Sequence, residues 1–149
     1  MTSNTYQMRG SEGKLYLTVN GFIMAYAESF TAVLKENCKP YSFRGVRMDV
    51  PINYSLTLTL RGLSMPNTDI AEQVIKDLSR GQLSDFVFKG YYKTNGGDLA
   101  PITLHRCIPL YEDLDMFLNG EVSEWDFEVR PHTSEQYDIA DIFKTCGRS

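Results

Sequence analysis

The chain has 149 residues, of which 42% are apolar, 23% charged and 12% aromatic, a composition typical of a folded globular protein. The length fits one domain over residues 1–149. Its 15 Lys and Arg against 19 Asp and Glu give a net charge of −4, which argues against a protein that mainly binds nucleic acid through a basic surface.

The charge is unevenly distributed along the chain. Residues 1–111 carry 12 basic and 9 acidic side chains, whereas residues 112–149 carry 3 basic and 10 acidic ones. The three cysteines (Cys38, Cys107 and Cys146) are widely spaced, and the polar first dozen residues lack the apolar core of a signal peptide. We therefore expect reduced thiols and folding in a cytoplasm.

The first half of the chain favours strands separated by turns. Residues 1–13 are polar and are expected to form an N-terminal arm. Residues 14–19 are expected to form a strand that ends at the hairpin dipeptide Asn20-Gly21. Residues 22–34 are again rich in strand-forming residues. Residues 36–51 contain two prolines and a glycine, which predict a long irregular loop, and loops of this length usually serve a function.

The second half combines further strands with one helix. Three leucines (Leu56, Leu58 and Leu60) alternate with polar residues and predict a strand over 53–61 with one apolar face. Residues 68–81 have the cap and the apolar stripe of a helix. Further strands are expected at 85–94, 102–111, 113–118 and 121–130, with a tail over 131–149. Six or seven strands and one helix predict a mainly β fold, an antiparallel β-sandwich or barrel with one flanking α-helix.

The sequence contains no recognisable motif for catalysis or metal binding. The two histidines, His105 and His132, lack metal-ligand spacing to a cysteine or to each other. The acidic residues at 112–115 are expected to form a solvated loop. We therefore predict no catalytic residue, no metal site and no cofactor.

Several short motifs follow one another in an order that is informative. The block Gly10-Ser11-Glu12-Gly13 runs directly into a strand, and Gly45-Val46-Arg47-Met48 ends the predicted loop. These motifs resemble the G-x-E-G opening and the G-R-R-M motif of tail tube proteins of contractile phage tails, with Val46 in place of the first arginine. The resemblance extends over nearly the whole chain, through Met24-Ala25, Ser29-Phe30-Thr31-Ala32, the strand at 53–61, the helix, Ile102-Thr103-Leu104 and Trp125-Asp126-Phe127-Glu128.

The resemblance implies a structural subunit and no enzyme. Such subunits form six-membered rings that stack into a hollow tube inside a contractile sheath, in a virion or a tail-like bacteriocin particle assembled in the bacterial cytoplasm. Residues 36–51 would then reach the adjacent ring, with Arg44, Gly45, Arg47 and Met48 as interface residues. The implied partners are copies of the chain, the sheath, baseplate and tape-measure proteins, and DNA passing through the lumen, with no membrane insertion by this chain.

Two other interpretations stay open. A secretion-system tube protein of the same fold predicts rings that are stable without a sheath. A small β-barrel enzyme or ligand-binding protein predicts a pocket lined by Tyr91, Tyr92 and Trp125. Lys89 and Lys93 lie beside the two tyrosines, a weak basic–aromatic pattern of the kind that binds single-stranded nucleic acid. The ordinary alternation of side chains in a β-strand explains this pattern equally well.

Overall fold

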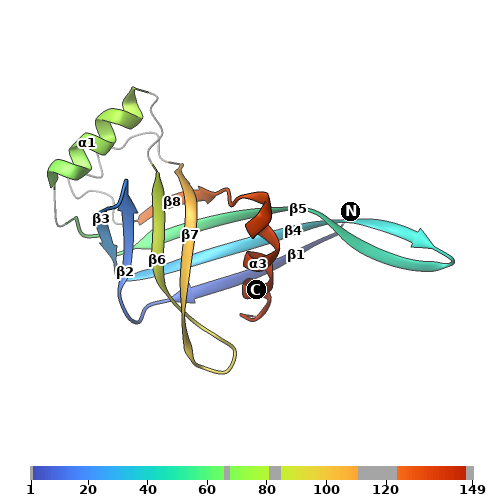
Figure 1. The fold of residues 1–149 in the computed structure, drawn as a ribbon. Coiled ribbons are helices and arrows are strands. Elements are labelled where there is room, and N and C mark those ends of the chain that lie inside the picture. Colours follow the sequence, from blue (N-terminus) through green and yellow to red (C-terminus); the bar gives the residue numbers. More distant parts are fainter. Residues whose placement is uncertain (1, 66–67, 81–84, 111–123, 147–149) are drawn as a thin grey trace.

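The computed structural model describes residues 2–65, 68–80, 85–110 and 124–146. This part of the chain forms eight strands and two helices (Figure 1). They are β1 (Thr2–Gly10), β2 (Leu15–Val19), β3 (Phe22–Ala27), β4 (Ser29–Phe43), β5 (Val46–Arg61), α1 (Thr68–Ser79), β6 (Phe86–Lys93), β7 (Leu99–Pro109), β8 (Glu124–Val129) and α3 (Thr133–Lys144). The predicted strand at 113–118 and the acidic residues at 112–115 lie outside the described residues.

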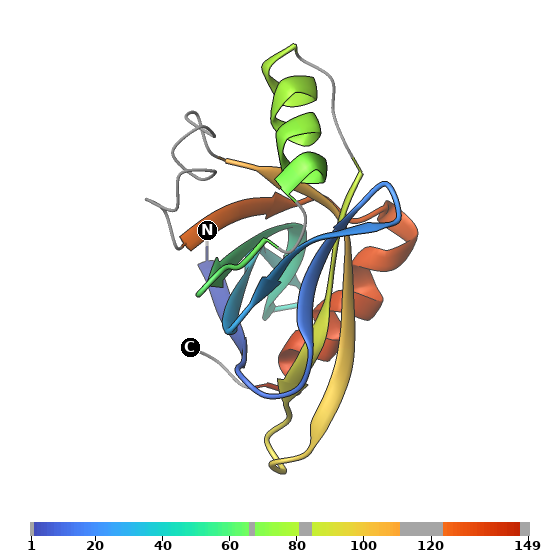
Figure 2. The same ribbon diagram turned by 90° about the vertical axis from the view of Figure 1, so that its left-hand side faces the viewer.

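The strands form one antiparallel sheet in the order β1-β4-β5-β8-β7-β6-β2-β3. The prediction of a mainly β, antiparallel fold with a flanking helix is confirmed, and α3 is a second helix that the sequence did not predict. The sheet is strongly curved, so that β1, β4 and β5 cross behind β2, β6 and β7 (Figures 1 and 2). No helix among the described residues is long and apolar enough to cross a membrane.

The core lies between these two crossed layers. The alternating leucines of β5 (Leu56, Leu58 and Leu60) are at most 2% exposed, as their sequence pattern predicted. They pack in one cluster with aromatic side chains from β4, β6 and β8, namely Phe30, Phe86, Phe88, Trp125 and Phe127. Strand alternation therefore provides each layer with one buried and one solvated face.

Residues 2–10 form strand β1 of the sheet instead of a separate N-terminal arm. Strand β1 pairs with β4 from Thr2 opposite Cys38 to Gly10 opposite Phe30, and Met8 is fully buried. At the end of β1, a Cβ added to Gly10 would lie 2.1 Å from the carbonyl oxygen of Tyr91 on β6. The prediction of an N-terminal arm was wrong. The alternation of buried and exposed side chains is difficult to recognise in a polar strand whose large buried residues are Tyr6 and Met8.

The glycine-rich block after β1 has a packing role against β6. Gly13 has a φ of +79°, and a Cβ there would lie 2.7 Å from the Tyr91 ring. Glu12 pairs with Lys93, with 2.9 Å between Oε1 and Nζ. The motif Gly10-Ser11-Glu12-Gly13 therefore packs against β6. At Gly10 and Gly13, a side chain larger than hydrogen would not fit without a shift of β6.

The predicted tail at 131–149 is mostly helix α3, which packs on its own domain. Phe143 is fully buried in the core, and Ile139 is only 9% exposed. Lys144 reaches back to Glu36 on β4, with 3.3 Å between Nζ and Oε2. The sequence analysis assigned no helix to this tail, whose stability depends largely on packing of its apolar side against the domain.

Candidate functional site

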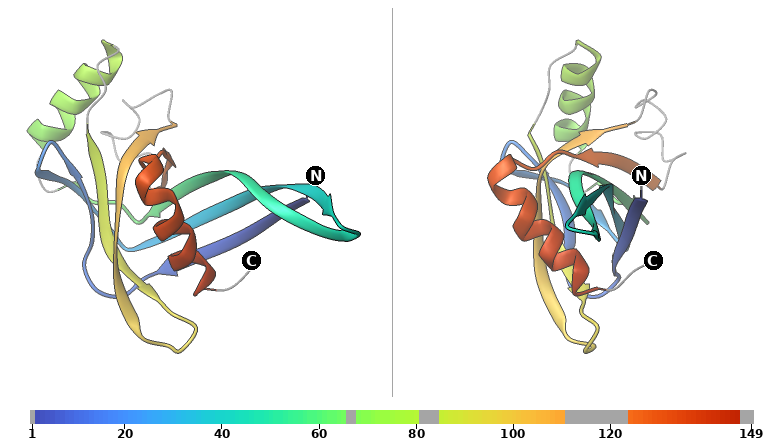
Figure 3. Two further views of the ribbon diagram at one scale, coloured as in Figure 1. Left: turned by 45° about the vertical axis from the view of Figure 1, so that its right-hand side comes forward. Right: turned by 90° about the vertical axis from the view of Figure 1, so that its right-hand side faces the viewer.

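The strands β4 and β5 continue well beyond the body of the domain. β1 pairs with β4 only as far as Cys38, and β8 pairs with β5 only from Leu56 to Arg61. Residues 39–50, which we call the arm, therefore pair only with each other among the described residues. Figure 1 and the left view of Figure 3 show the arm projecting from one side of the molecule. With five residues on each strand, it extends about 17 Å.

The tip of the arm is a tight two-residue turn. Phe43 pairs with Val46, and the two residues between them have positive φ, +51° for Arg44 and +80° for Gly45. Two successive positive φ values are the pattern of a type I′ turn, whose twist matches that of a hairpin. Glycine adopts this conformation without strain, whereas arginine does so at a cost.

One face of the arm is apolar and exposed. Cross-strand pairing places Tyr41 opposite Met48 and Phe43 opposite Val46, and the next pair is Lys39 with Val50. The exposed fractions are 64% for Phe43, 60% for Val46, 49% for Met48, 48% for Tyr41 and 37% for Val50. A contiguous apolar patch on a projecting ribbon is characteristic of a protein contact surface.

An irregularity at the base of the arm creates this face. The pairs Asn37–Asn53 and Cys38–Pro51 leave Ile52 without a partner position on β4. Such an extra residue shifts the alternation of one strand relative to the other by one. As a result, Met48 and Val46 lie on the same face as Tyr41 and Phe43, instead of on the face of Ser42.

The predicted irregular loop at 36–51 was therefore wrong, because this segment is a β-hairpin. Pro40 and Pro51 misled the prediction: proline is tolerated in a ribbon with free outer edges and at a bulge. The hairpin signal was present, since apolar and polar residues alternate on both sides of Arg44-Gly45. It was missed because arginine replaces the asparagine that usually precedes glycine in this turn.

The four predicted interface residues do not share one face. Arg44 and Gly45 form the turn, Met48 lies on the apolar face, and Arg47 lies on the polar face opposite Ser42. The Arg44 guanidinium carbon lies 5.4 Å from the centre of the Phe43 ring. Prediction from sequence missed the apolar partners of Met48, namely Tyr41, Phe43, Val46 and Val50.

The base of the arm holds a buried carboxylate. Glu36 is 4% exposed, and besides its ion pair with Lys144 it accepts a 3.5 Å hydrogen bond from Cys38 Sγ. Burial lowers the pKa of Lys144, but the hydrogen bond and charge of Glu36 outweigh this and raise it overall. Burial, together with Glu36, raises the pKa of the Cys38 thiol. The pair thus ties α3 to the point where the arm leaves the domain.

The three residues of the alternative pocket do not come together in one cavity. Tyr91 is 39% exposed on the outer face of β6, and its neighbour Tyr92 points inward and is buried. Trp125 on β8 is fully buried, with its ring centre 4.6 Å from that of Phe127 and the two ring planes tilted by 45°. These aromatic side chains serve the core and the surface separately.

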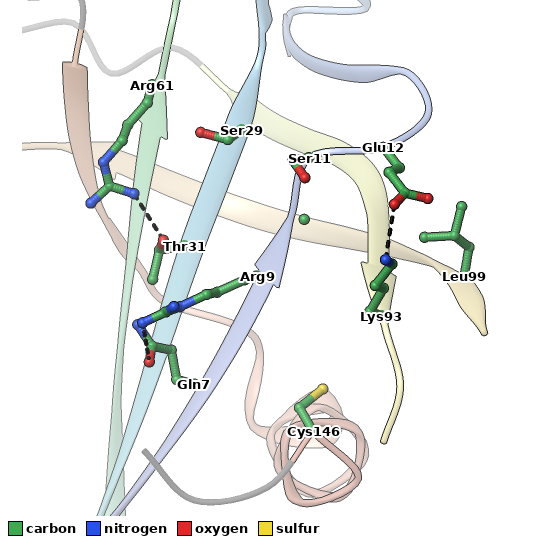
Figure 4. Close-up of a pocket in the computed structure, with 11 residues that line it drawn as sticks. Gln7, Arg9, Ser11, Glu12, Ser29, Thr31, Arg61, Lys93, Leu99 and Cys146 are labelled. Carbon is green, nitrogen blue, oxygen red and sulfur yellow. Dashed lines mark hydrogen bonds and ion pairs between the residues drawn. The ribbon is translucent and has the colours of Figure 1, made fainter. Parts of the chain in front are cut away.

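A broad hollow of about 730 Å³ lies elsewhere, beside β1 and β4. Figure 4 shows Arg9, Arg61 and Lys93 around it, each directed to a neighbouring side chain. Arg9 donates to Gln7 at 3.0 Å, and Arg61 donates to Thr31 at 2.8 Å. Because these groups already have partners and the hollow is polar and open, it offers little for holding an apolar ligand.

The described residues include no group of three or more His, Cys, Asp or Glu side chains that could hold a metal ion. No family model matches this chain, and no curated protein sequence matches it. The projecting arm is therefore the feature from which a function is best argued.

Proposed function

We propose that this chain is a structural subunit that assembles with copies of itself into the inner tube of a contractile phage tail or tail-like particle. In this assembly, rings stack into a hollow conduit, and the arm of each subunit contacts a subunit of the adjacent ring. The observation that carries the proposal is the exposed apolar face of the arm, with five large apolar side chains between 37% and 64% exposed.

The stability of the arm depends on what covers its apolar face. A two-stranded ribbon is marginally stable in water unless its apolar face packs against something. No other described element covers the face of Tyr41, Phe43, Val46 and Met48, and a neighbouring subunit would do so. Burial of such side chains is the main source of free energy in permanent assemblies.

The solvated face of β1, β4, β5 and β8 supports a water-filled conduit. Register places Arg9, Thr31, Thr59 and Asp126 in one row across these strands, and Thr59 donates a 2.6 Å hydrogen bond to Asp126. A polar, hydrogen-bonded sheet face is suited to line an aqueous lumen. The number of six subunits in a ring comes from the resemblance to tail tube proteins.

Electron microscopy of the purified protein over a concentration range, with sedimentation velocity, tests the proposal. We expect rings or hollow tubes that lengthen with concentration for the unaltered chain. Met48→Glu, which places a charge on the exposed apolar face of the arm, should reduce stacking while leaving the fold intact. Uniform monomers at every concentration would refute the assembly proposal.

A further inference from the structure

The outer face of the sheet formed by β3, β2, β6 and β7 has an unusual charge pattern. These four strands contain no Asp or Glu, but they contain Lys89, Lys93, His105 and Arg106. The lysines are exposed on the same face of β6 as Tyr91. In a chain whose net charge is −4, this face is a basic island.

Aromatic side chains lie among these lysines. Register places Tyr26, Tyr16 and Lys89 in one row across β3, β2 and β6. The ammonium of Lys14 lies 5.7 Å from the Tyr16 ring centre and 5.5 Å from that of Tyr26. We call Lys14, Tyr16, Tyr26, Lys89 and Tyr91 the basic–aromatic face. Tyrosines beside exposed cations are a common composition of protein contact surfaces.

Two of these cations are available for a partner. Lys93 is already paired with Glu12, whereas no ion pair is formed by Lys14 or Lys89 within the described residues. A surface with only two unpaired lysines lacks the run of cations that follows a nucleic-acid backbone. It fits a small acidic protein surface better.

The same chain carries such a surface on α3. Glu135, Asp138 and Asp141 are spaced three residues apart and therefore lie along one side of the helix. Asp138 and Asp141 are exposed, and neither forms an ion pair with another described residue. The three carboxylates extend over about 9 Å of helix. Lys14 lies two residues before Tyr16, the partner of Lys89 across β2 and β6, which corresponds to about 7 Å along the strand direction. Two flexible lysines at this spacing can reach carboxylates on neighbouring turns of the helix.

The helix that carries the acidic residues and the strands that carry the basic–aromatic face are different parts of the subunit. In Figure 1, α3 lies beside β7, on the side away from β2 and β3. One copy can therefore present the acidic side of α3 to the basic–aromatic face of the next, and a contact between two different surfaces propagates into a ring or a filament.

We propose that α3 of one subunit docks on the basic–aromatic face of its neighbour, with Asp138 and Asp141 opposite Lys14 and Lys89. This inference rests on the proposed function and specifies a second self-contact, separate from the arm. Complementary charges fix the register and exclude wrong pairings, since like charges facing each other at an interface cost several-fold or more in affinity.

Charge reversal on each side provides the test. Lys89→Glu and Asp138→Lys should each raise the protein concentration needed for assembly by about tenfold or more, because each places like charges across the contact. The variant carrying both changes should assemble nearly as the unaltered chain does. An equimolar mixture of the two single variants should also assemble, because every alternating contact is then complementary.

Sedimentation velocity at 50 mM and 300 mM salt, with circular dichroism to verify folding, measures these outcomes. Lys35→Glu, an exposed lysine on β4, is the matched control and should assemble normally. Single reversals without effect, or an equal effect of Lys35→Glu, would overturn the α3 contact. So would failure of both the double variant and the mixture to assemble, or binding of a 20-nucleotide single-stranded DNA that requires Lys89.

The result separates this contact from the proposed function. If the unaltered chain forms rings or tubes that respond to changes in the arm but not to Lys89→Glu, the α3 contact is refuted and the tube proposal stands. If the unaltered chain stays monomeric at all concentrations, both are refuted.

Discussion

Replacement of Phe43 by serine should weaken assembly strongly while leaving the isolated subunit nearly unchanged. Phe43 is 64% exposed at the end of the arm. A phenylalanine presents about 200 Å² of surface, so about 130 Å² is available for burial by a partner, corresponding to about 3 kcal/mol at 25 cal/mol per Å². Incomplete packing at the interface reduces this value, so we expect the substitution to weaken each contact by about 2–3 kcal/mol. This corresponds to a factor of about 30 to 150 in the association constant.

The effect on the fold should be small, because substitutions at exposed positions usually change stability by less than about 0.5 kcal/mol. Assembly is measured by sedimentation velocity and electron microscopy across at least three decades of concentration. The free energy of unfolding is measured by urea denaturation below the assembly concentration. The expected result is a large increase in the assembly concentration with an unchanged unfolding midpoint.

Phe22→Ser is a closely matched control. Phe22 is 63% exposed at the start of β3, so this change removes the same side chain with the same exposure from another place. Its assembly concentration should stay within about threefold of that of the unaltered chain, an effect of about 0.6 kcal/mol. An equal effect of both substitutions would show that general surface hydrophobicity drives association and would refute a specific contact through the arm.

Three further predictions address the turn, the sheet closure and a buried thiol. Arg44→Asn should stabilise the arm by about 0.5–1 kcal/mol, because asparagine tolerates positive φ better than arginine; urea denaturation measures it, and a loss of stability would contradict the turn assignment. Gly10→Ala should destabilise the domain by at least about 1–3 kcal/mol by overpacking, since its Cβ would lie 2.1 Å from the Tyr91 carbonyl oxygen; an unchanged melting temperature would contradict that close approach. Burial raises the pKa of the Cys107 thiol to about 12 from 9.0. Because the unfolded thiol ionises first, stability that is complete below pH 9 should fall by about 1.4 kcal/mol by pH 10 from this group alone, and Cys107→Ala should reduce that fall in urea denaturation at pH 7.5 and 10.

Local sequence patterns predicted much of the sheet correctly. The alternating leucines of β5 predicted a strand with one buried face, and Asn20-Gly21 predicted a hairpin turn, where φ is +50° and +87°. The helix at 68–81 was also predicted correctly, as α1 over Thr68–Ser79. These features depend on spacing within a few residues, so the sequence contains the information directly.

The arm shows where local patterns were insufficient. Arg44-Gly45 has the same pair of positive φ values as Asn20-Gly21, but arginine has no intrinsic preference for this conformation and the turn was not recognised. The two strands on either side stabilise it through their pairing. Met48 was identified as an interface residue, but the apolar face to which it belongs depends on the register shift at Ile52, which the sequence does not reveal.

The sequence by itself determined the strand alternation, the class of fold and the acidic end of the chain. The tertiary structure decided where β1 and α3 pack, because Met8 and Phe143 are buried only through contacts with residues distant in the chain. It also decided that the arm projects from the domain, because β1 pairs with β4 only as far as Cys38 and β8 pairs with β5 only from Leu56 to Arg61. The physical reason is that side-chain alternation is a local property, whereas strand partners and register depend on contacts between distant segments.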